Sequence, residues 1–180
     1  MTNSTTIMLH SGAAMDFLDP SSSEFTLEDI AHGLSNLCRY TGQCKKFYSV
    51  AEHSILVSET VVNFGLEALL HDAAEAFVGD LTRPLKQLLP EFKVIENRIQ
   101  NVILKRFGIS ELMPQQVKEA DIRVLAAEQA QLMPAGLSNW TIETGVVPAL
   151  VQVRYLSPKS AKEKYLKRFA ELGRIKGLSA

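Results

Sequence analysis

Ionisable side chains are concentrated in one short stretch of this sequence, LLHDAAEAFVGDLTRPLK, at residues 69–86. His71 and Asp72 follow directly after an apolar run, and Glu75 and Asp80 come soon after them. A helix that only contributes to a core does not need so many ionisable groups. A neutral imidazole beside a carboxylate suits a divalent first-row metal ion. The stretch therefore predicts metal-centred chemistry, with a solvated helix face as the alternative interpretation.

Two ligands do not make a firm metal site, so further ligands must come from other parts of the chain. His53, in SVAEHSILVSE, and Asp121, in VKEADIRVLAAE, are the candidates. With His71 and Asp72 they would supply four protein ligands and leave positions open for water and substrate. Such a set is compatible with Zn²⁺, Mn²⁺, Co²⁺ or Fe²⁺, with Mg²⁺ as a candidate second ion. The remaining histidines, His10 and His32, are interpreted as ordinary structural residues.

Two further carboxylates could act on a water molecule at such a site. Glu75 lies three residues beyond Asp72, on the same face of an expected helix. A carboxylate that does not bind the metal can orient or deprotonate a nearby water. Asp80 could act in the same way, or could cap a helix that begins near Thr82.

Phosphate chemistry also requires cations, because the ester and its transition state are negatively charged. Arg39 could bind two phosphate oxygens at once, and Lys86 and Lys118 lie close in sequence to the candidate ligands. Each of these groups, taken alone, is better explained as a solvated surface charge, and only their grouping around one candidate metal site favours a phosphate-binding role. Further cations that a triphosphate would require are present at Arg83 and at Lys45–Lys46.

The elements that must position these residues are mainly helices. A small hairpin is expected around Ser11–Gly12, and a first helix is expected from Thr26 as N-cap to a break at Gly42. The apolar periodicity predicts further helices at 49–64, 66–78, within 80–89, and at 91–107 and 114–132. Residues 133–154 are expected to be irregular. The Ser157–Pro158 pair predicts the start of a last helix, with the core stripe Ala161, Tyr165, Leu166, Phe169 and Leu172. The predicted fold class is all-α.

Composition limits the class of protein. The chain has 180 residues, a formal net charge of −1 and 46% hydrophobic residues, which predicts one domain over residues 1–180. The neutral charge argues against a nucleic-acid scaffold or a polybasic membrane binder. No apolar run is long enough to span a membrane and no signal segment is recognisable, so a cytoplasmic protein is predicted. The two cysteines, Cys38 and Cys44, are then expected to be free thiols.

The order His53, His71-Asp72, Asp121 resembles the H…HD…D pattern of the HD-domain metal-dependent phosphohydrolases. HDAAEAFVGDLTRPLK is similar to the matching segment of bacterial 5′-deoxynucleotidases, and RYTGQ…YSVAEHS aligns with their arginine-aromatic and EHS segments. The phage dATP triphosphohydrolases are similar too, with a compact length and the same lysine three residues before the last aspartate. The resemblance covers roughly residues 30–128.

The resemblance implies a role for each candidate residue. His53, His71, Asp72 and Asp121 would bind the metal, while Glu75 would act on the attacking water with help from Asp80, which could instead contact the leaving oxygen. Arg39, Lys86 and Lys118 would hold phosphates, and Tyr40, where the family often has tryptophan, would border the nucleoside. The implied fold is an HD-domain helical bundle, commonly dimeric and hexameric in the phage type, which acts in the host cytoplasm.

The expected function is metal-dependent hydrolysis of deoxyribonucleotides. The compact length and the segment DIAHGLSNLCRYTGQ favour a dNTP (dATP) triphosphohydrolase, which releases a deoxynucleoside and triphosphate. One alternative is a 5′-deoxynucleotidase that acts on dNMPs, and another is hydrolysis of guanosine tetraphosphate-type alarmones. A third is a non-catalytic HD module that only binds a nucleotide or a partner.

Overall fold

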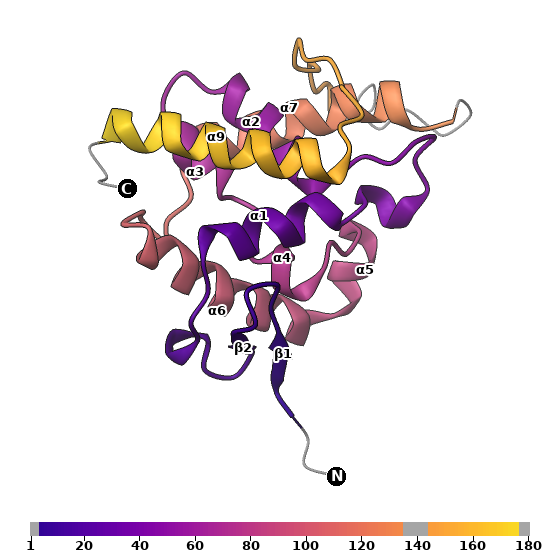
Figure 1. The fold of residues 1–180 in the computed structure, drawn as a ribbon. Helices are drawn as coiled ribbons and strands as arrows, with labels where there is room; N and C mark the ends of the chain where they lie inside the picture. Colours follow the sequence, from indigo (N-terminus) through magenta and orange to yellow (C-terminus); the bar gives the residue numbers. More distant parts are fainter. Residues whose placement is uncertain (1–3, 135–143, 177–180) are drawn as a thin grey trace.

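A computed structural model of the chain describes residues 4–134 and 144–176 (Figure 1). Its helices are α1 (Leu27–Asn36), α2 (Val50–Thr60), α3 (Gly65–Leu69), α4 (Glu75–Val78), α5 (Arg83–Leu88), α6 (Pro90–Arg106), α7 (Gln115–Leu132) and α9 (Pro158–Lys176). Short 3-10 segments lie at η1 (Pro20–Ser22) and η2 (Arg39–Gly42). The predicted all-α class is therefore confirmed. Within the described ranges, none of the helices combines the length and the apolar character that a membrane crossing requires.

The predicted N-terminal hairpin is also confirmed. Strands β1 (Thr6–Met8) and β2 (Ala14–Asp16) pair antiparallel, with Ile7 opposite Met15. Gly12, at φ +87, provides the left-handed residue in the connecting turn. In Figure 1 the hairpin lies beside α6, away from the long C-terminal helix α9.

Helix α1 begins at the predicted N-cap. The Thr26 hydroxyl accepts a hydrogen bond from the Asp29 amide, and the Asp29 carboxylate accepts one from the Thr26 amide, which forms a capping box. The Asp29 carboxylate also accepts a bond from the Ser11 amide at 2.8 Å, which ties the hairpin turn to the helix. The helix ends at Asn36, before the expected break at Gly42, and Arg39–Gly42 form the separate 3-10 segment η2.

The prediction of one continuous helix over 66–78 is wrong. Helix α3 ends at Leu69, α4 begins at Glu75, and residues 70–74 form turns between them. Gln100 of α6 explains the break, because its side chain accepts a hydrogen bond from the Ala74 amide at 2.9 Å and donates one to the Leu70 carbonyl at 2.7 Å. A distant side chain thus satisfies backbone groups at both ends of the turn.

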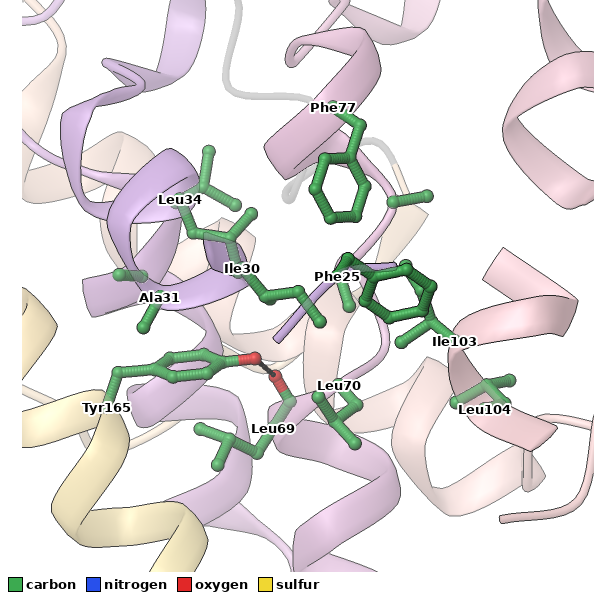
Figure 2. Close-up of a cluster of buried hydrophobic side chains, with 14 of the residues drawn as sticks. Phe25, Ile30, Ala31, Leu34, Leu69, Leu70, Phe77, Ile103, Leu104 and Tyr165 are labelled. Atoms are coloured by element: carbon green, nitrogen blue, oxygen red, sulfur yellow. Dashed lines mark hydrogen bonds between the residues drawn. The ribbon is translucent and has the colours of Figure 1, made fainter. Parts of the chain in front are cut away.

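Two hydrophobic clusters fill the interior. The larger joins the hairpin, α1, α3, α4, α6 and α9, and the smaller joins α7 with Tyr48 and residues 149–153. Figure 2 shows Tyr165 of α9 in the larger cluster, where its hydroxyl donates to the Leu69 carbonyl at 3.0 Å. Helix α2 contributes to both clusters and is buried from Val50 to Ser58. It therefore carries His53 into the interior of the molecule.

The C-terminal part follows the prediction where it is described. Helix α9 begins at Pro158 and contacts α1, α2 and α3. Three residues of its predicted stripe, Ala161, Tyr165 and Leu172, are buried, and Leu166 and Phe169 are partly buried against the same core. Of the segment predicted to be irregular, residues 146–154 have neither helix nor strand, and residues 135–143 lie outside the described residues.

Candidate metal centre

Two imidazole nitrogens face the same two carboxylates in the interior of the molecule. His53 Nε2, from α2, lies 3.2 Å from Asp121 Oδ1 and 3.6 Å from Asp72 Oδ2. His71 Nε2, from the turn before α4, lies 3.1 Å from Asp72 Oδ2 and 3.8 Å from Asp121 Oδ1. The structure thus brings together all four side chains that were predicted as ligands.

The other ring nitrogen of each histidine is already bonded. His53 Nδ1 lies 2.6 Å from Glu128 Oε1, and His71 Nδ1 lies 2.8 Å from the Ala68 carbonyl oxygen. Because a carboxylate and a carbonyl can only accept a hydrogen bond here, each Nδ1 carries the proton and each Nε2 of the neutral ring presents a lone pair. This is the usual arrangement of metal-binding histidines.

Both Nε2 atoms are buried and have no hydrogen-bond partner among the described residues. Carboxylate oxygens of Asp72 and Asp121 lie within ion-pair distance of them. A buried polar atom without a partner is costly unless something else satisfies it. The ligand atoms of His53, His71 and Asp121 lie within 4.8 Å of one another, so this group could hold a metal ion. Asp72 Oδ2 adds a fourth donor beside both rings.

The charges at this site attract a cation. Although burial acts to lower it, the carboxylates of Asp72 and Asp121 raise the pKa of His71 well above its usual range. Burial acts to raise the pKa of Asp121, but the approach of both imidazoles lowers it well below its usual range. These shifts favour a proton on the imidazoles beside the ionised carboxylates, and a divalent ion bound here would displace that proton. Asp72 and Asp121 are 25% and 29% exposed, so the site is open on their side.

Glu75 and Lys86 line a cavity together with two of the candidate ligands, His71 and Asp72. A cavity of about 100 Å³ is lined by His71, Asp72, Ala74, Glu75, Lys86, Glu96, Asn97 and Gln100. Lys86 donates to Glu75 Oε1 at 2.8 Å and to Glu96 Oε1 at 2.7 Å. The other oxygen, Glu75 Oε2, is buried without a hydrogen-bond partner in the described part of the chain. Burial, together with the charges of Asp72 and Asp80, raises the pKa of Glu75 well above its usual range.

The geometry behind Glu75 differs from the prediction. His71 and Asp72 lie in a turn, so a shared helix face does not place Glu75 beside them. Glu75 instead begins α4, and its amide donates to the Asp72 carbonyl at 3.0 Å. Asp80 follows Gly79, the C-cap of α4, and makes no capping bond to α5, whose N-cap Thr82 lacks a side-chain cap. The capping alternative for Asp80 is therefore wrong.

Arg39 and Tyr40 also reach the site. The Arg39 guanidinium is buried, with Nη1 3.8 Å from Asp72 Oδ2 and Nε 3.5 Å from Glu128 Oε2. The Tyr40 hydroxyl donates to Glu128 Oε2 at 3.1 Å. Tyr40 and Thr41 have φ values of 56° and 52°, a left-handed backbone that is uncommon for residues other than glycine. The η2 segment is therefore held in a strained conformation beside the site.

The remaining predicted residues lie elsewhere. Lys118 is exposed on α7, one turn before Asp121, and no contact of its side chain with the site is seen. The rings of His10 and His32 stack at 3.8 Å beside a separate cavity of about 390 Å³, behind α4. Cys38 and Cys44 flank η2, and their sulfur atoms lie 3.7 Å apart without a disulfide.

Sequence reasoning missed two charged residues near the site. Glu128 is fully buried against His53, and Glu96 shares Lys86 with Glu75. Glu128 lies seven residues, or two helical turns, after Asp121 on α7, so the spacing itself indicated that both face the same side. No comparable signal marks Glu96, because its contact depends on how α5 and α6 meet.

Comparisons with known proteins identify two relatives that match most of the chain. No family model matches it. The uncharacterized protein YfdR of Escherichia coli K12 is 39% identical over 156 residues, which cover 85% of this chain and 87% of YfdR. An uncharacterized protein of Rhodobacter capsulatus is 38% identical over 121 residues, which cover 61% of this chain and 62% of that protein. Over such coverage this level of identity establishes common descent, and the chain belongs to the family of YfdR.

Proposed function

We propose that this protein is a metal-dependent phosphohydrolase of deoxyribonucleotides of the HD-domain type. The observation that carries the proposal is that ligand atoms of His53, His71 and Asp121 lie within 4.8 Å of one another, with Asp72 Oδ2 close to both rings. The buried carboxylate of Glu75 lies near Asp72. A bound divalent ion would polarise the phosphoryl oxygen. It would also lower the pKa of a bound water molecule, so that this water can lose a proton and act as a nucleophile at neutral pH.

Glu75 is suited to receive the proton of the attacking water. Its Oε1 is held by Lys86, while Oε2 has no partner among the described residues. Its raised pKa makes it a stronger base than an exposed carboxylate. The water oxygen would bond to the phosphorus as the bond between phosphorus and the sugar oxygen breaks.

Asp80 is suited to assist at the leaving oxygen. Burial, together with the charge of Asp72, raises its pKa, while Arg39 opposes the rise. A raised pKa keeps a proton available for the sugar oxygen, which leaves as an alcohol. In the same proposal Arg39 and Lys86 hold phosphate oxygens and Tyr40 borders the nucleoside, so substrate phosphate would compete with the carboxylates that both cations now contact. Lys118, exposed on α7, would meet the outer phosphates of a longer chain.

The proposed substrate is a dNTP such as dATP, with a deoxynucleoside and triphosphate as products. Hydrolysis of dNMPs is a second candidate, and two observations favour it. Lys86 is already bonded to both Glu75 and Glu96, and the cavity that it lines is small. A single phosphate would need fewer free cations than a triphosphate chain.

Product identification tests the proposal and separates the two substrates. The purified protein is incubated with Co²⁺ or Mn²⁺ and with dATP, dAMP or guanosine tetraphosphate, and the phosphate product is identified. Triphosphate from dATP is the expected result, and orthophosphate from dAMP without a reaction on dATP would identify the 5′-deoxynucleotidase. Turnover of the alarmone alone, or of none of these compounds, would contradict the proposed function.

A further inference from the structure

Glu128 of α7 is a completely buried carboxylate surrounded by hydrogen-bond donors. Its Oε1 accepts from the Tyr48 hydroxyl at 2.6 Å and lies 2.6 Å from His53 Nδ1. Its Oε2 accepts from the Tyr40 hydroxyl at 3.1 Å and lies 3.5 Å from Arg39 Nε. Oε1 therefore contacts a candidate metal ligand, His53, and Oε2 contacts two candidate substrate-binding residues, Tyr40 and Arg39.

The chemistry of these neighbours requires a carboxylate. All four contribute N–H or O–H donors, and an ionised carboxylate is acceptor-only. It accepts from the Tyr40 and Tyr48 hydroxyls and from His53 Nδ1, and it pairs by charge with Arg39. An amide of the same shape would turn its own N–H₂ group toward two of the donors. Burial of a charge is costly unless the charge is paired and hydrogen-bonded. An apolar residue would fill the same space without that cost, so packing alone does not explain a glutamate here.

We infer that Glu128 is a positioning residue that sets the orientation of the metal ligand His53 and of Arg39 and Tyr40 through a single carboxylate. The inference rests on the proposed metal-dependent function, which it deepens. Oε1 accepts a hydrogen bond from His53 Nδ1, and this contact orients the ring so that the Nε2 lone pair points toward Asp72 and Asp121. Oε2 accepts a hydrogen bond from the hydroxyl of Tyr40, which holds the strained η2 segment beside the same site.

Glu128→Gln tests this role, and Glu52→Gln is the matched control. Glu52 is also a fully buried glutamate and directly precedes His53, but its oxygens accept from the Arg154 and Leu156 amides rather than from a candidate ligand. Co²⁺ affinity is measured by calorimetry without nucleotide. We expect Glu128→Gln to weaken Co²⁺ binding about 10-fold to 100-fold, as loss of a partner behind a metal ligand typically does. Glu52→Gln should bind Co²⁺ as the parent protein does.

A spectroscopic measurement separates orientation from general destabilisation. In the Zn²⁺-loaded protein, long-range ¹H–¹⁵N correlations report which nitrogen of His53 carries the proton. We expect protonated Nδ1 in the parent and in Glu52→Gln, and a changed Nδ1 signal in Glu128→Gln. Wild-type Co²⁺ affinity together with an unchanged His53 signal in folded Glu128→Gln would overturn the inference.

Tyr48→Phe provides an independent variant if Glu128→Gln does not fold. It removes one donor from Oε1, and the hydrogen bond of the Tyr48 hydroxyl goes to Glu128 rather than to a candidate ligand. We expect a several-fold loss of Co²⁺ affinity, and an unchanged affinity would then overturn the inference. Because affinity is measured without nucleotide, a parent that binds Co²⁺ but hydrolyses no nucleotide would refute the proposed reaction and leave the role of Glu128 standing.

Discussion

Glu75 is the residue on which the proposed chemistry depends most directly. It is almost fully buried, its Oε1 is bonded to Lys86, and its Oε2 lacks a partner in the described chain. A carboxylate in this position could serve catalysis, or could simply neutralise Lys86. These two roles predict different consequences when the charge is removed.

Glu75→Gln is expected to lower kcat about 100-fold to 10,000-fold, because the amide cannot take a proton from the attacking water. Co²⁺ affinity should change little, since Glu75 is not among the four candidate ligands. The measurement is the steady-state rate with dATP and saturating Co²⁺.

Glu96→Gln is the matched control for Glu75→Gln. Glu96 bonds the same Lys86 nitrogen at 2.7 Å and lines the same cavity. If Glu75 acts on the water, the control should retain most of its activity. Equal losses in the two variants would indicate that both carboxylates act only through Lys86.

At the scale of the elements, most helices follow from periodicity and caps, but the site does not. The N-cap at Thr26 and the start of α9 at Pro158 are local signals, and both are found in the structure. The break between α3 and α4 depends on Gln100, which comes from a helix about 30 residues later in the sequence. Long-range contacts of this kind override local helix preference, so the sequence pattern could not reveal the break.

The candidate ligands could be predicted because their residue types are chemically informative, not because their elements were placed correctly. His71 and Asp72 occupy a turn rather than a helix, and they still meet His53 and Asp121. Glu128 was not predicted, although its spacing of seven residues from Asp121 is evident in the sequence. Which cations would reach the site was unpredictable, since that depends on how exposed helices pack.

The end of α4 makes a prediction about Gly79, which has φ 86° and ψ 157°. Only glycine adopts this region easily, and the position precedes Asp80. We expect Gly79→Ala to lower the free energy of unfolding by about 1–3 kcal/mol through backbone strain. An added Cβ would meet no atom within 4 Å, so a steric clash does not contribute.

Gly173→Ala in α9 is the control for the Gly79 prediction. Its Cβ would also meet nothing within 4 Å, but the residue lies within a helix. There alanine should stabilise the protein by up to about 1 kcal/mol, because it has the higher helix propensity. Urea unfolding measures both variants, and a neutral Gly79→Ala would show that this conformation is not strained.

The capping box of α1 makes a pH-dependent prediction. Burial acts to raise the pKa of Asp29, but hydrogen bonds from Thr26 and from the Ser11 amide outweigh it and lower the pKa. A lowered pKa means that the carboxylate stabilises the fold above its unfolded pKa of about 3.9, and that this stabilisation is lost as the pH falls below that value. Asp29→Asn should therefore cost about 1 kcal/mol at pH 7 and progressively less below about pH 4.

Urea unfolding at pH 7 and at pH 3 measures the difference between the parent and Asp29→Asn. The difference in unfolding free energy between the two proteins should become smaller at the lower pH, because Asp29 is then partly protonated in both states. A gap of the same size at both pH values would show that the charge of Asp29 contributes nothing, and that only its shape matters.

At the scale of the whole molecule, the candidate site joins the two hydrophobic clusters. His53 lies on α2, which contributes to both clusters, and Asp121 lies on α7, which belongs to the smaller one. An ion bound by both helices would therefore stabilise the complete fold. The buried, unsatisfied Nε2 atoms of His53 and His71 add to the cost of folding without the ion.

Cation binding should consequently raise the melting temperature. At a free Co²⁺ concentration 100 times the Kd, the gain is about 2.7 kcal/mol, or about 5–10 °C for a chain of this size. Differential scanning fluorimetry with Co²⁺ and then with excess chelator measures the change. His71→Ala should show no comparable shift, and an equal shift in this variant would mean that Co²⁺ stabilises the protein from another place.

The most direct test of the metal centre is a crystal structure of the Co²⁺-loaded protein with anomalous data collected at the cobalt edge. We expect one strong anomalous peak about 2.0–2.2 Å from His53 Nε2, His71 Nε2 and oxygens of Asp72 and Asp121. A map without a peak between these side chains, or with the ion bound only at other residues, would contradict it.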